Sequence, residues 1–211
     1  MKNRSIFYLT LTLFLSGTLL IQTVDAAPTK GTLRVSGDNT WVVFINGEEV
    51  AASGNWQVPT VSEFKLDKGF AQIAVYVHDA EPGAAGRGGF LADIILNDKP
   101  DYIGTGEEGW RCDTGEPIAD RKDDWMEVDF DDSDWEDELE IYEQFGGGIW
   151  GFGAAIMEQI LKDPECEANW VWCGPNDAED DIYFRYTIGT LSVEPEDKLT
   201  TTWARIKRET L

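Results

Sequence analysis

Short apolar runs with alternating polar positions recur along the chain and are separated by turn-forming residues. Because side chains of a strand point alternately to its two faces, this pattern predicts β-strands. The ranges expected in the first half are 33–36, 40–45, 49–51, 63–66, 71–78 and 90–96. The range 71–77 shows little polar alternation, which is typical of a central strand buried on both faces.

The residues between these runs predict tight turns. Asn46-Gly47 favours a hairpin, because a type I′ turn needs positive φ at both central positions, and 67–69 (Asp-Lys-Gly) indicates another. In the second half the pattern predicts strands at 110–112, 125–128, 169–172 and 182–188, and a helix at about 154–161, ahead of Pro164.

Many short strands at regular turn spacing predict an all-β fold. A doubly wound parallel sheet would need long crossover helices, which the pattern does not supply. We therefore expect an antiparallel jelly-roll β-sandwich with one or two short helices.

The first residues have the pattern of an export signal. Positive charges at Lys2 and Arg4 precede an apolar run over 6–21, and small residues stand before Ala27. A membrane anchor is the alternative, but a spanning helix needs about 20 apolar residues and this run is shorter. We expect a signal peptide at 1–26, one domain at 27–191, a C-terminal tail at 192–211, no membrane span in the mature protein, and a secreted, periplasmic or extracellular location.

The net charge of −23 is strongly acidic. Such a charge repels phosphate backbones and anionic lipid, so nucleic acid is not an expected partner. Some of the acidity could instead bind Ca²⁺ through oxygen ligands, with 131–133 and 177–181 as sources of carboxylates. The alternative for both segments is ordinary turn and solvated-loop chemistry.

Cys112, Cys166 and Cys173 follow the leader, and an oxidising compartment favours one disulfide among them. If 169–173 is extended, Cys166 and Cys173 lie too far apart to pair, because bridged Cα atoms sit within about 7 Å. Cys112 is then the expected common partner, and the choice between the other two stays open.

Several motifs, in their order and spacing, resemble the galactose-binding-domain-like jelly-roll family. The closest pattern is that of accessory carbohydrate-binding modules of glycoside hydrolases such as α-L-rhamnosidases. The motifs are DNTWVVFINGE (38–48), GNW (54–56), LDKG (66–69), IAV (73–75), GGFLA (88–92), WRC (110–112), FDDSDW (130–135), WVW (170–172) and YFR (183–185). The resemblance implies a secreted β-sandwich that often binds carbohydrate and often holds a structural calcium; it does not imply catalysis.

Strand parity predicts where a site would form. If successive strands run antiparallel, the loops after the first, third and fifth strands meet at one end. A sugar site needs an aromatic ring on which the sugar can pack and side chains that hydrogen-bond to its hydroxyl groups. These loops contain both kinds of side chain. The expected sugar-binding residues are Asp38, Asn39, Asn55, Trp56, Asp79 and Arg87.

Other functions remain as alternatives. His78, the single histidine, could act as a general base in a glycoside hydrolase, but no catalytic motif marks a nucleophile or a carboxylate pair. A cell-surface interaction or assembly module, using the tail or exposed tryptophans, is a third class. Burial in the core is the simpler interpretation of most tryptophans: Trp41, Trp110, Trp135, Trp170 and Trp172.

Overall fold

The fold is described from a computed structural model. The described residues are 28–80, 87–96, 102–115, 124–143 and 168–190. The predicted signal peptide, the tail, the helix at 154–161 and Cys166 lie outside them.

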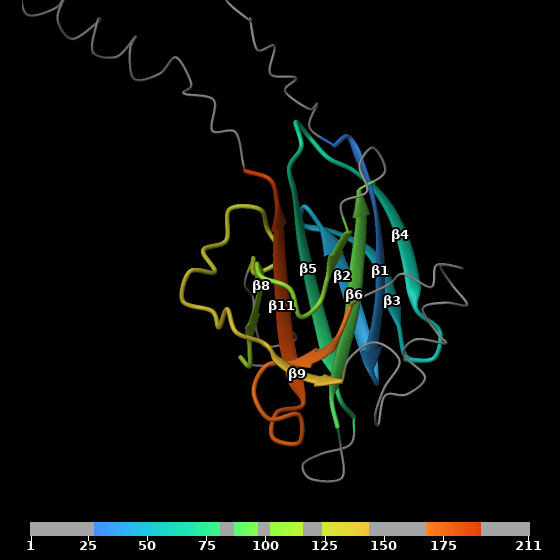
Figure 1. Ribbon diagram of the computed structural model, residues 1–211, viewed down its shortest axis with the longest axis vertical. Coiled ribbons are helices and arrows are strands. Elements are labelled where there is room, and N and C mark those ends of the chain that lie inside the picture. The colour runs from blue at the N-terminus through green and yellow to red at the C-terminus, as the bar shows by residue number, and fades with distance from the viewer. Residues whose placement is uncertain (1–27, 81–86, 97–101, 116–123, 144–167, 191–211) are drawn as a thin grey trace, which may run out of the picture.

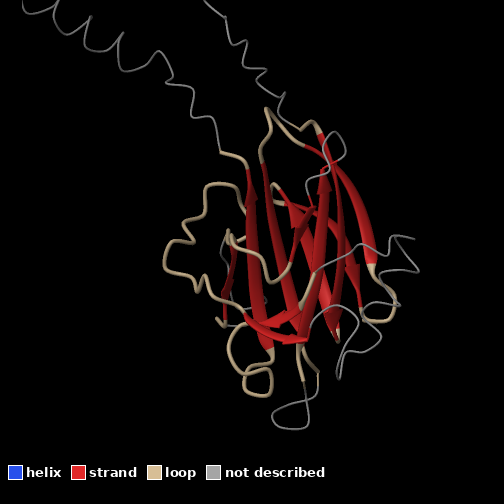
Figure 2. Cartoon of the chain, viewed as in Figure 1, coloured by secondary structure: helices blue, strands red, loops and turns tan. Residues whose placement is uncertain are grey.

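The described residues form two antiparallel sheets that pack face to face (Figure 1). They contain strands and loops but no helix (Figure 2), so the predicted all-β sandwich is confirmed. One sheet has the order β4 (Thr60–Lys65), β1 (Lys30–Asp38), β6 (Gly89–Leu96), β10 (Trp170–Trp172), β9 (Glu140–Glu143), with β7 (Tyr102–Gly104) also paired to β6. The other has the order β3 (Glu48–Ser53), β2 (Thr40–Ile45), β5 (Ala71–His78), β11 (Asp181–Ile188), β8 (Trp110–Asp113).

The core lies between the inward faces of these sheets. Alternate residues of each strand enter it, as Leu33 and Val35 do from β1 and Trp41 and Val43 do from β2. Aromatic rings fill its centre, where Phe90 stacks on Phe184 with ring centroids 4.2 Å apart. The four tryptophans predicted as core and now found fully buried are Trp41, Trp110, Trp170 and Trp172.

A disulfide ties the two sheets together. Cys112 of β8 and Cys173, directly after β10, are joined, and their Cα atoms lie 5.8 Å apart. The expectation that Cys112 forms the disulfide is confirmed, and its partner is Cys173.

The prediction of a strand at 125–128 was wrong. These residues form a turn, in which the N–H of Glu127 donates to the carbonyl of Asp124. The segment 124–136 lies over the outer face of the second sheet, where Trp125 packs on Tyr183 at 5.0 Å. Trp135 belongs to the same covering segment and is half-buried rather than part of the central core.

Arg185 holds this covering segment to the sheet. Its Nε donates to Asp132 Oδ2 at 2.8 Å, and its guanidinium also donates to the carbonyls of Trp125 and Glu127. Arg185 is 2% exposed, so the cation is satisfied in a largely dry environment. The apolar pattern of 125–128 therefore reflects packing on a sheet, which periodicity cannot distinguish from membership of one.

Candidate functional site

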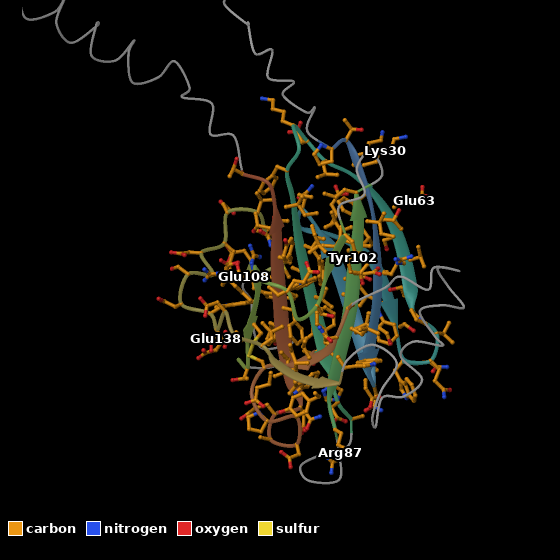
Figure 3. All side chains as sticks on the ribbon, viewed as in Figure 1. Lys30, Glu63, Arg87, Tyr102, Glu108 and Glu138 are labelled. Carbon is orange, nitrogen blue, oxygen red and sulfur yellow. A yellow bond between two sulfur atoms is a disulfide. The ribbon has the colours of Figure 1, made fainter. Side chains whose placement is uncertain are left out.

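One end of the sandwich gathers the loops in which the sequence places the sugar-binding residues. We call this end the rim; it comprises 38–39, 54–59, 79–80, 87–88 and 173–180. Strand registers establish it: Asp38 at the end of β1 faces Gly89 at the start of β6, and His78 at the end of β5 faces Thr40 and Asp181. Figure 3 shows Arg87 at this end and Lys30 at the opposite end.

The two tight turns close the opposite end. Asn46 and Gly47 have φ of 52° and 82°, and Lys68 and Gly69 have φ of 52° and 84°. Positive φ at both central positions is what a type I′ hairpin turn requires. The convergence of the other loops, expected from strand parity, is therefore what the structure shows.

Asp38 and Asn39 form the corner between β1 and β2. Asn39 Nδ2 donates to Asp38 Oδ1 at 2.9 Å, and the Asn39 N–H donates to the His78 carbonyl at 2.7 Å. The Ala80 N–H in turn donates to Asn39 Oδ1 at 2.5 Å. The amide of Asn39 thus links two rim loops and fixes the Asp38 carboxylate beside them.

Asp79 and Arg87 flank the loop between β5 and β6. Asp79 is 3% exposed, and its N–H donates to the carbonyl of Asp180, so it anchors the rim from beneath. Arg87 is exposed, and its neighbour Gly88 is held by Asn176: the Gly88 N–H donates to the Asn176 carbonyl, and Asn176 Nδ2 donates back to the Gly88 carbonyl. The Arg87 guanidinium is therefore exposed to solvent, next to a backbone that is held by hydrogen bonds at Gly88.

Asn55 and Trp56 lie on the β3–β4 loop. Asn55 is exposed and shapes a turn, because its Oδ1 accepts from the Gln57 N–H at 3.0 Å. The Trp56 carbonyl accepts from Ser36 Oγ at 2.6 Å. Its indole is half-buried and packs against the apolar clusters on the β1 and β6 side, including Trp170.

The rim therefore brings all six predicted residues to one end but gives them different exposures. Asn55 and Arg87 present polar groups to solvent, and Asn39 is half-exposed. Asp38 and Asp79 are largely covered, which suits a positioning role better than first contact with a ligand.

Two further residues join His78 beside the rim: Tyr76, which the sequence pattern did not indicate, and Asp181, which the sequence offered only as part of the acidic segment 177–181. His78 Nδ1 lies 2.9 Å from Asp181 Oδ1, and the Tyr76 hydroxyl donates to the same oxygen. Burial, and then this hydrogen bond, raise the pKa of Tyr76 well above its ordinary value, so the phenol stays protonated. Once β5 and β11 are known to pair, the alternation of their side chains predicts that Tyr76, His78 and Asp181 lie on one face. The sequence does not reveal that these two strands pair.

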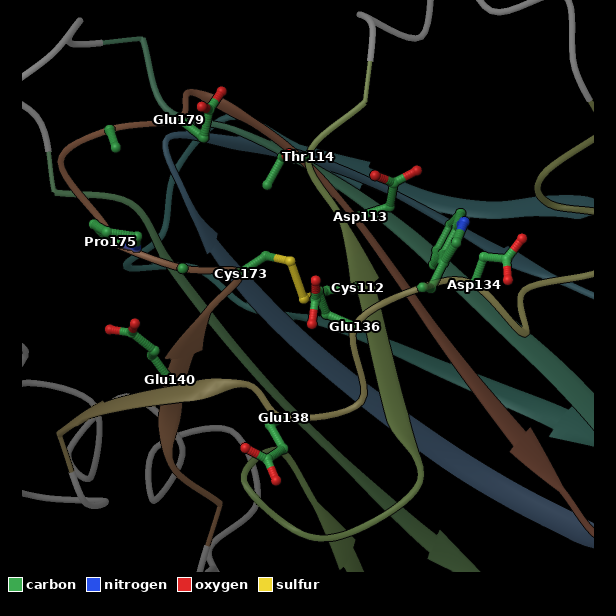
Figure 4. A pocket seen from close by; sticks show the side chains of 13 residues that line it. Cys112, Asp113, Thr114, Asp134, Glu136, Glu138, Glu140, Cys173, Pro175 and Glu179 are labelled. Atoms are coloured by element: carbon green, nitrogen blue, oxygen red, sulfur yellow. A yellow bond between two sulfur atoms is a disulfide. The ribbon is translucent and has the colours of Figure 1, made fainter.

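A hollow lies beside the disulfide, between β8, the segment leading to β9 and the loop after β10, whose residues 173–175 and 178–179 also belong to the rim (Figure 4). Its volume is about 450 Å³, and none of the six predicted residues lines it. Its lining carries carboxylates without a lysine or arginine: Asp113, Asp134, Glu136, Glu138, Glu140 and Glu179.

The described residues do not present a metal site built from side chains. Among them, no group of three or more His, Cys, Asp or Glu is placed to hold an ion. Asp131 caps a turn: hydrogen bonds from the Ser133 hydroxyl first, and then from the Ser133 N–H, lower the pKa of its carboxyl. Asp132 is bound to Arg185. The turn interpretation of 131–133 is the one that fits, and we derive no role through calcium at this place.

The chain is similar to part of an α-L-rhamnosidase. The relative comes from Streptomyces avermitilis and is 29% identical over 142 residues, which is 61% of this chain but only 12% of that protein. The match therefore covers a small part of the relative's length. It fits a domain associated with glycoside hydrolases.

No family model matches the chain, and no solved structure matches it significantly. Within the described ranges, we find no helix of the length and apolarity that crossing a membrane would require.

Proposed function

We propose that this chain is a secreted, non-catalytic carbohydrate-binding module whose binding site is the rim. The observation that carries the proposal is the convergence of four loops at one end, where Asn39, Asn55 and Arg87 present hydrogen-bonding groups on a fixed backbone. Sugar hydroxyls are recognised by such amide and guanidinium forks.

The similarity to an α-L-rhamnosidase supports carbohydrate as the ligand class and suggests α-L-rhamnosides as the first glycans to test. A non-catalytic role is supported by the small share of that protein which the match covers.

A glycan array carrying α-L-rhamnosides tests the proposal. The mature protein should bind a defined subset of glycans, and soluble sugar of the same kind should compete. Arg87→Ala should weaken binding about tenfold, since a charge-assisted hydrogen bond contributes about 1.5–3 kcal/mol. The matched control is Lys65→Ala, an exposed cation at the opposite end of the sandwich, which should bind normally.

Absence of binding to every glycan would contradict the proposal, and so would equal weakening by both variants. Hydrolysis of a glycoside by the purified protein would contradict the non-catalytic part. A calcium requirement remains a prediction: the same array with a chelator should show reduced binding if an ion supports the rim.

A further inference from the structure

The outer face of the second sheet carries an organised polar cluster directly beside the rim. In register, Thr40 of β2 faces His78 of β5, which faces Asp181 of β11. Directly opposed residues of neighbouring strands share a face, so these three side chains form one row. Tyr76, two residues before His78, lies on the same face.

The row is held in place by its own hydrogen bonds. Asp181 Oδ1 accepts from the Tyr76 hydroxyl and lies 2.9 Å from His78 Nδ1. The Tyr76 ring also packs against Tyr183, its neighbour across β5 and β11, which is fully buried and whose ring centroid lies 5.2 Å away. These contacts already restrict the side chains of the row, so binding a ligand would cost little further side-chain entropy.

The row is also accessible. The His78 side chain is 39% exposed, that of Asp181 is 24% exposed, and Thr40 is exposed. With Nδ1 directed at the carboxylate, His78 has Nε2 left for another partner, and no hydrogen bond to it occurs among the described residues. Asp181 Oδ2 is a second unused acceptor in the described part of the chain.

The cluster is continuous with the rim. The His78 carbonyl accepts from the Asn39 N–H at 2.7 Å, and the next residue, Asp79, belongs to the rim. From β2 to β11 the row spans two strand spacings, about 10 Å. An aromatic ring edge, an imidazole nitrogen and a carboxylate along such a line are the groups that contact a sugar ring.

We propose that Thr40, Tyr76, His78 and Asp181 form a second sugar subsite, so that the chain binds an oligosaccharide running from the rim onto the outer face of β2, β5 and β11. This inference rests on the proposed function, because it assigns the ligand's second residue to a surface adjoining the proposed rim site. It makes chains of at least two sugar residues the preferred ligands.

Isothermal titration calorimetry with methyl α-L-rhamnoside and with α-L-rhamnosyl oligosaccharides of two, three and four residues tests the subsite. The wild-type affinity should rise about tenfold from the monosaccharide to the disaccharide or trisaccharide, since one or two added hydrogen bonds supply that much. His78→Ala should remove this gain and leave monosaccharide affinity unchanged.

Asp181→Asn should reduce the gain as well, because it removes the carboxylate charge and replaces the acceptor Oδ2, which is left for the sugar, with an NH2 donor. His78→Gln keeps a hydrogen-bonding side chain and serves if His78→Ala is poorly folded; it should retain part of the gain. Lys65→Ala, remote from the row, should show the full length dependence.

The outcomes separate the two proposals. Equal wild-type affinity for all lengths, or equal loss at every length in His78→Ala, would overturn the subsite while leaving the rim intact. Absence of wild-type binding at every length would overturn rhamnoside binding at the rim, and the subsite with it.

Discussion

At the scale of single residues, a few buried polar groups determine how the surface of the sandwich is arranged. Arg185 is the main one, because its guanidinium joins β11 to the covering segment 124–136 through Asp132 and two backbone carbonyls. It also lies over the Phe130 ring, 5.2 Å from its centroid. In the sequence, Arg185 is an arginine within the predicted strand 182–188, and nothing there marks it as buried; its burial depends on a segment 50 residues or more away in sequence.

Arg185→Lys should therefore lower the free energy of unfolding by about 3 kcal/mol. Lysine cannot make the hydrogen bonds of the planar guanidinium, and the Asp132 carboxylate keeps its charge without this buried partner in place. Arg111→Lys is the control: its side chain is 34% exposed and its Nε lies 3.9 Å from Asp132 Oδ1, so a loss below about 1 kcal/mol is expected. Urea unfolding measures both. Similar losses of unfolding free energy in the two variants would show that Arg185 does not hold the covering segment to the sheet.

Tyr142 gives a prediction for alkaline pH. Its hydroxyl lies 2.8 Å from Glu140 Oε2 and 2.9 Å from the Gly174 carbonyl oxygen, the two acceptors within reach of its single proton. Burial, followed by the hydrogen bond to Glu140, raises its pKa from 10.0 to about 12. A raised pKa means that the folded state keeps a proton which the unfolded chain releases. The stability that this group contributes is complete below pH 10 and is lost as the pH rises toward 12.

The free energy of unfolding should fall across this window, and it should fall less steeply in Tyr142→Phe, which has no phenol to titrate. Tyr76 and Tyr186, whose pKa values are also raised, contribute equally to both proteins. Urea unfolding at a series of pH values compares the slopes. Parallel slopes would contradict the assignment.

At the scale of elements, the strands with long apolar runs were predictable, and two of the short strands, β7 and β9, were not. The ranges 40–45 and 71–78 match β2 and β5, whose apolar runs are long and bounded by turn residues. β7 and β9 were missed, because three or four residues carry too little periodicity to separate a strand from a loop.

The covering segment was misassigned for a related reason, since an apolar stretch that packs on a sheet looks like one that belongs to it. The disulfide was partly predictable: extension of 169–173 excluded one pairing, but the choice of Cys173 depended on how β8 and β10 meet in space.

That disulfide makes an element-scale prediction. It closes a loop between residues 61 positions apart, so replacing both cysteines (Cys112→Ala with Cys173→Ala) should lower the free energy of unfolding by about 4 kcal/mol. Cys166→Ser is the control and should keep one disulfide, detected by mass spectrometry. A double variant as stable as the wild type would mean that the bond does not constrain the chain.

At the scale of the whole molecule, the antiparallel order of the strands places loops and tight turns at opposite ends. This was predictable from the sequence, because parity alone assigns each connection to an end. The exposure of each rim residue was not predictable: Asp79 is buried beneath the rim and Trp56 leans on the β1 and β6 side, both through contacts with distant strands. The His78 cluster was also hidden, since it needs β2, β5 and β11 side by side.

The central claim is that this end of the sandwich receives the sugar. The most direct test is a titration of the ¹⁵N-labelled mature protein with methyl α-L-rhamnoside, followed by nuclear magnetic resonance. If the sugar binds at the rim, chemical shifts should change at the amides of Asn39, Ala80 and Gly88. They should stay constant at the amides of Asn46 and Lys68, at the opposite end. Shifts confined to Asp113 and Glu136 in the acidic hollow, or to the tight turns, would contradict it.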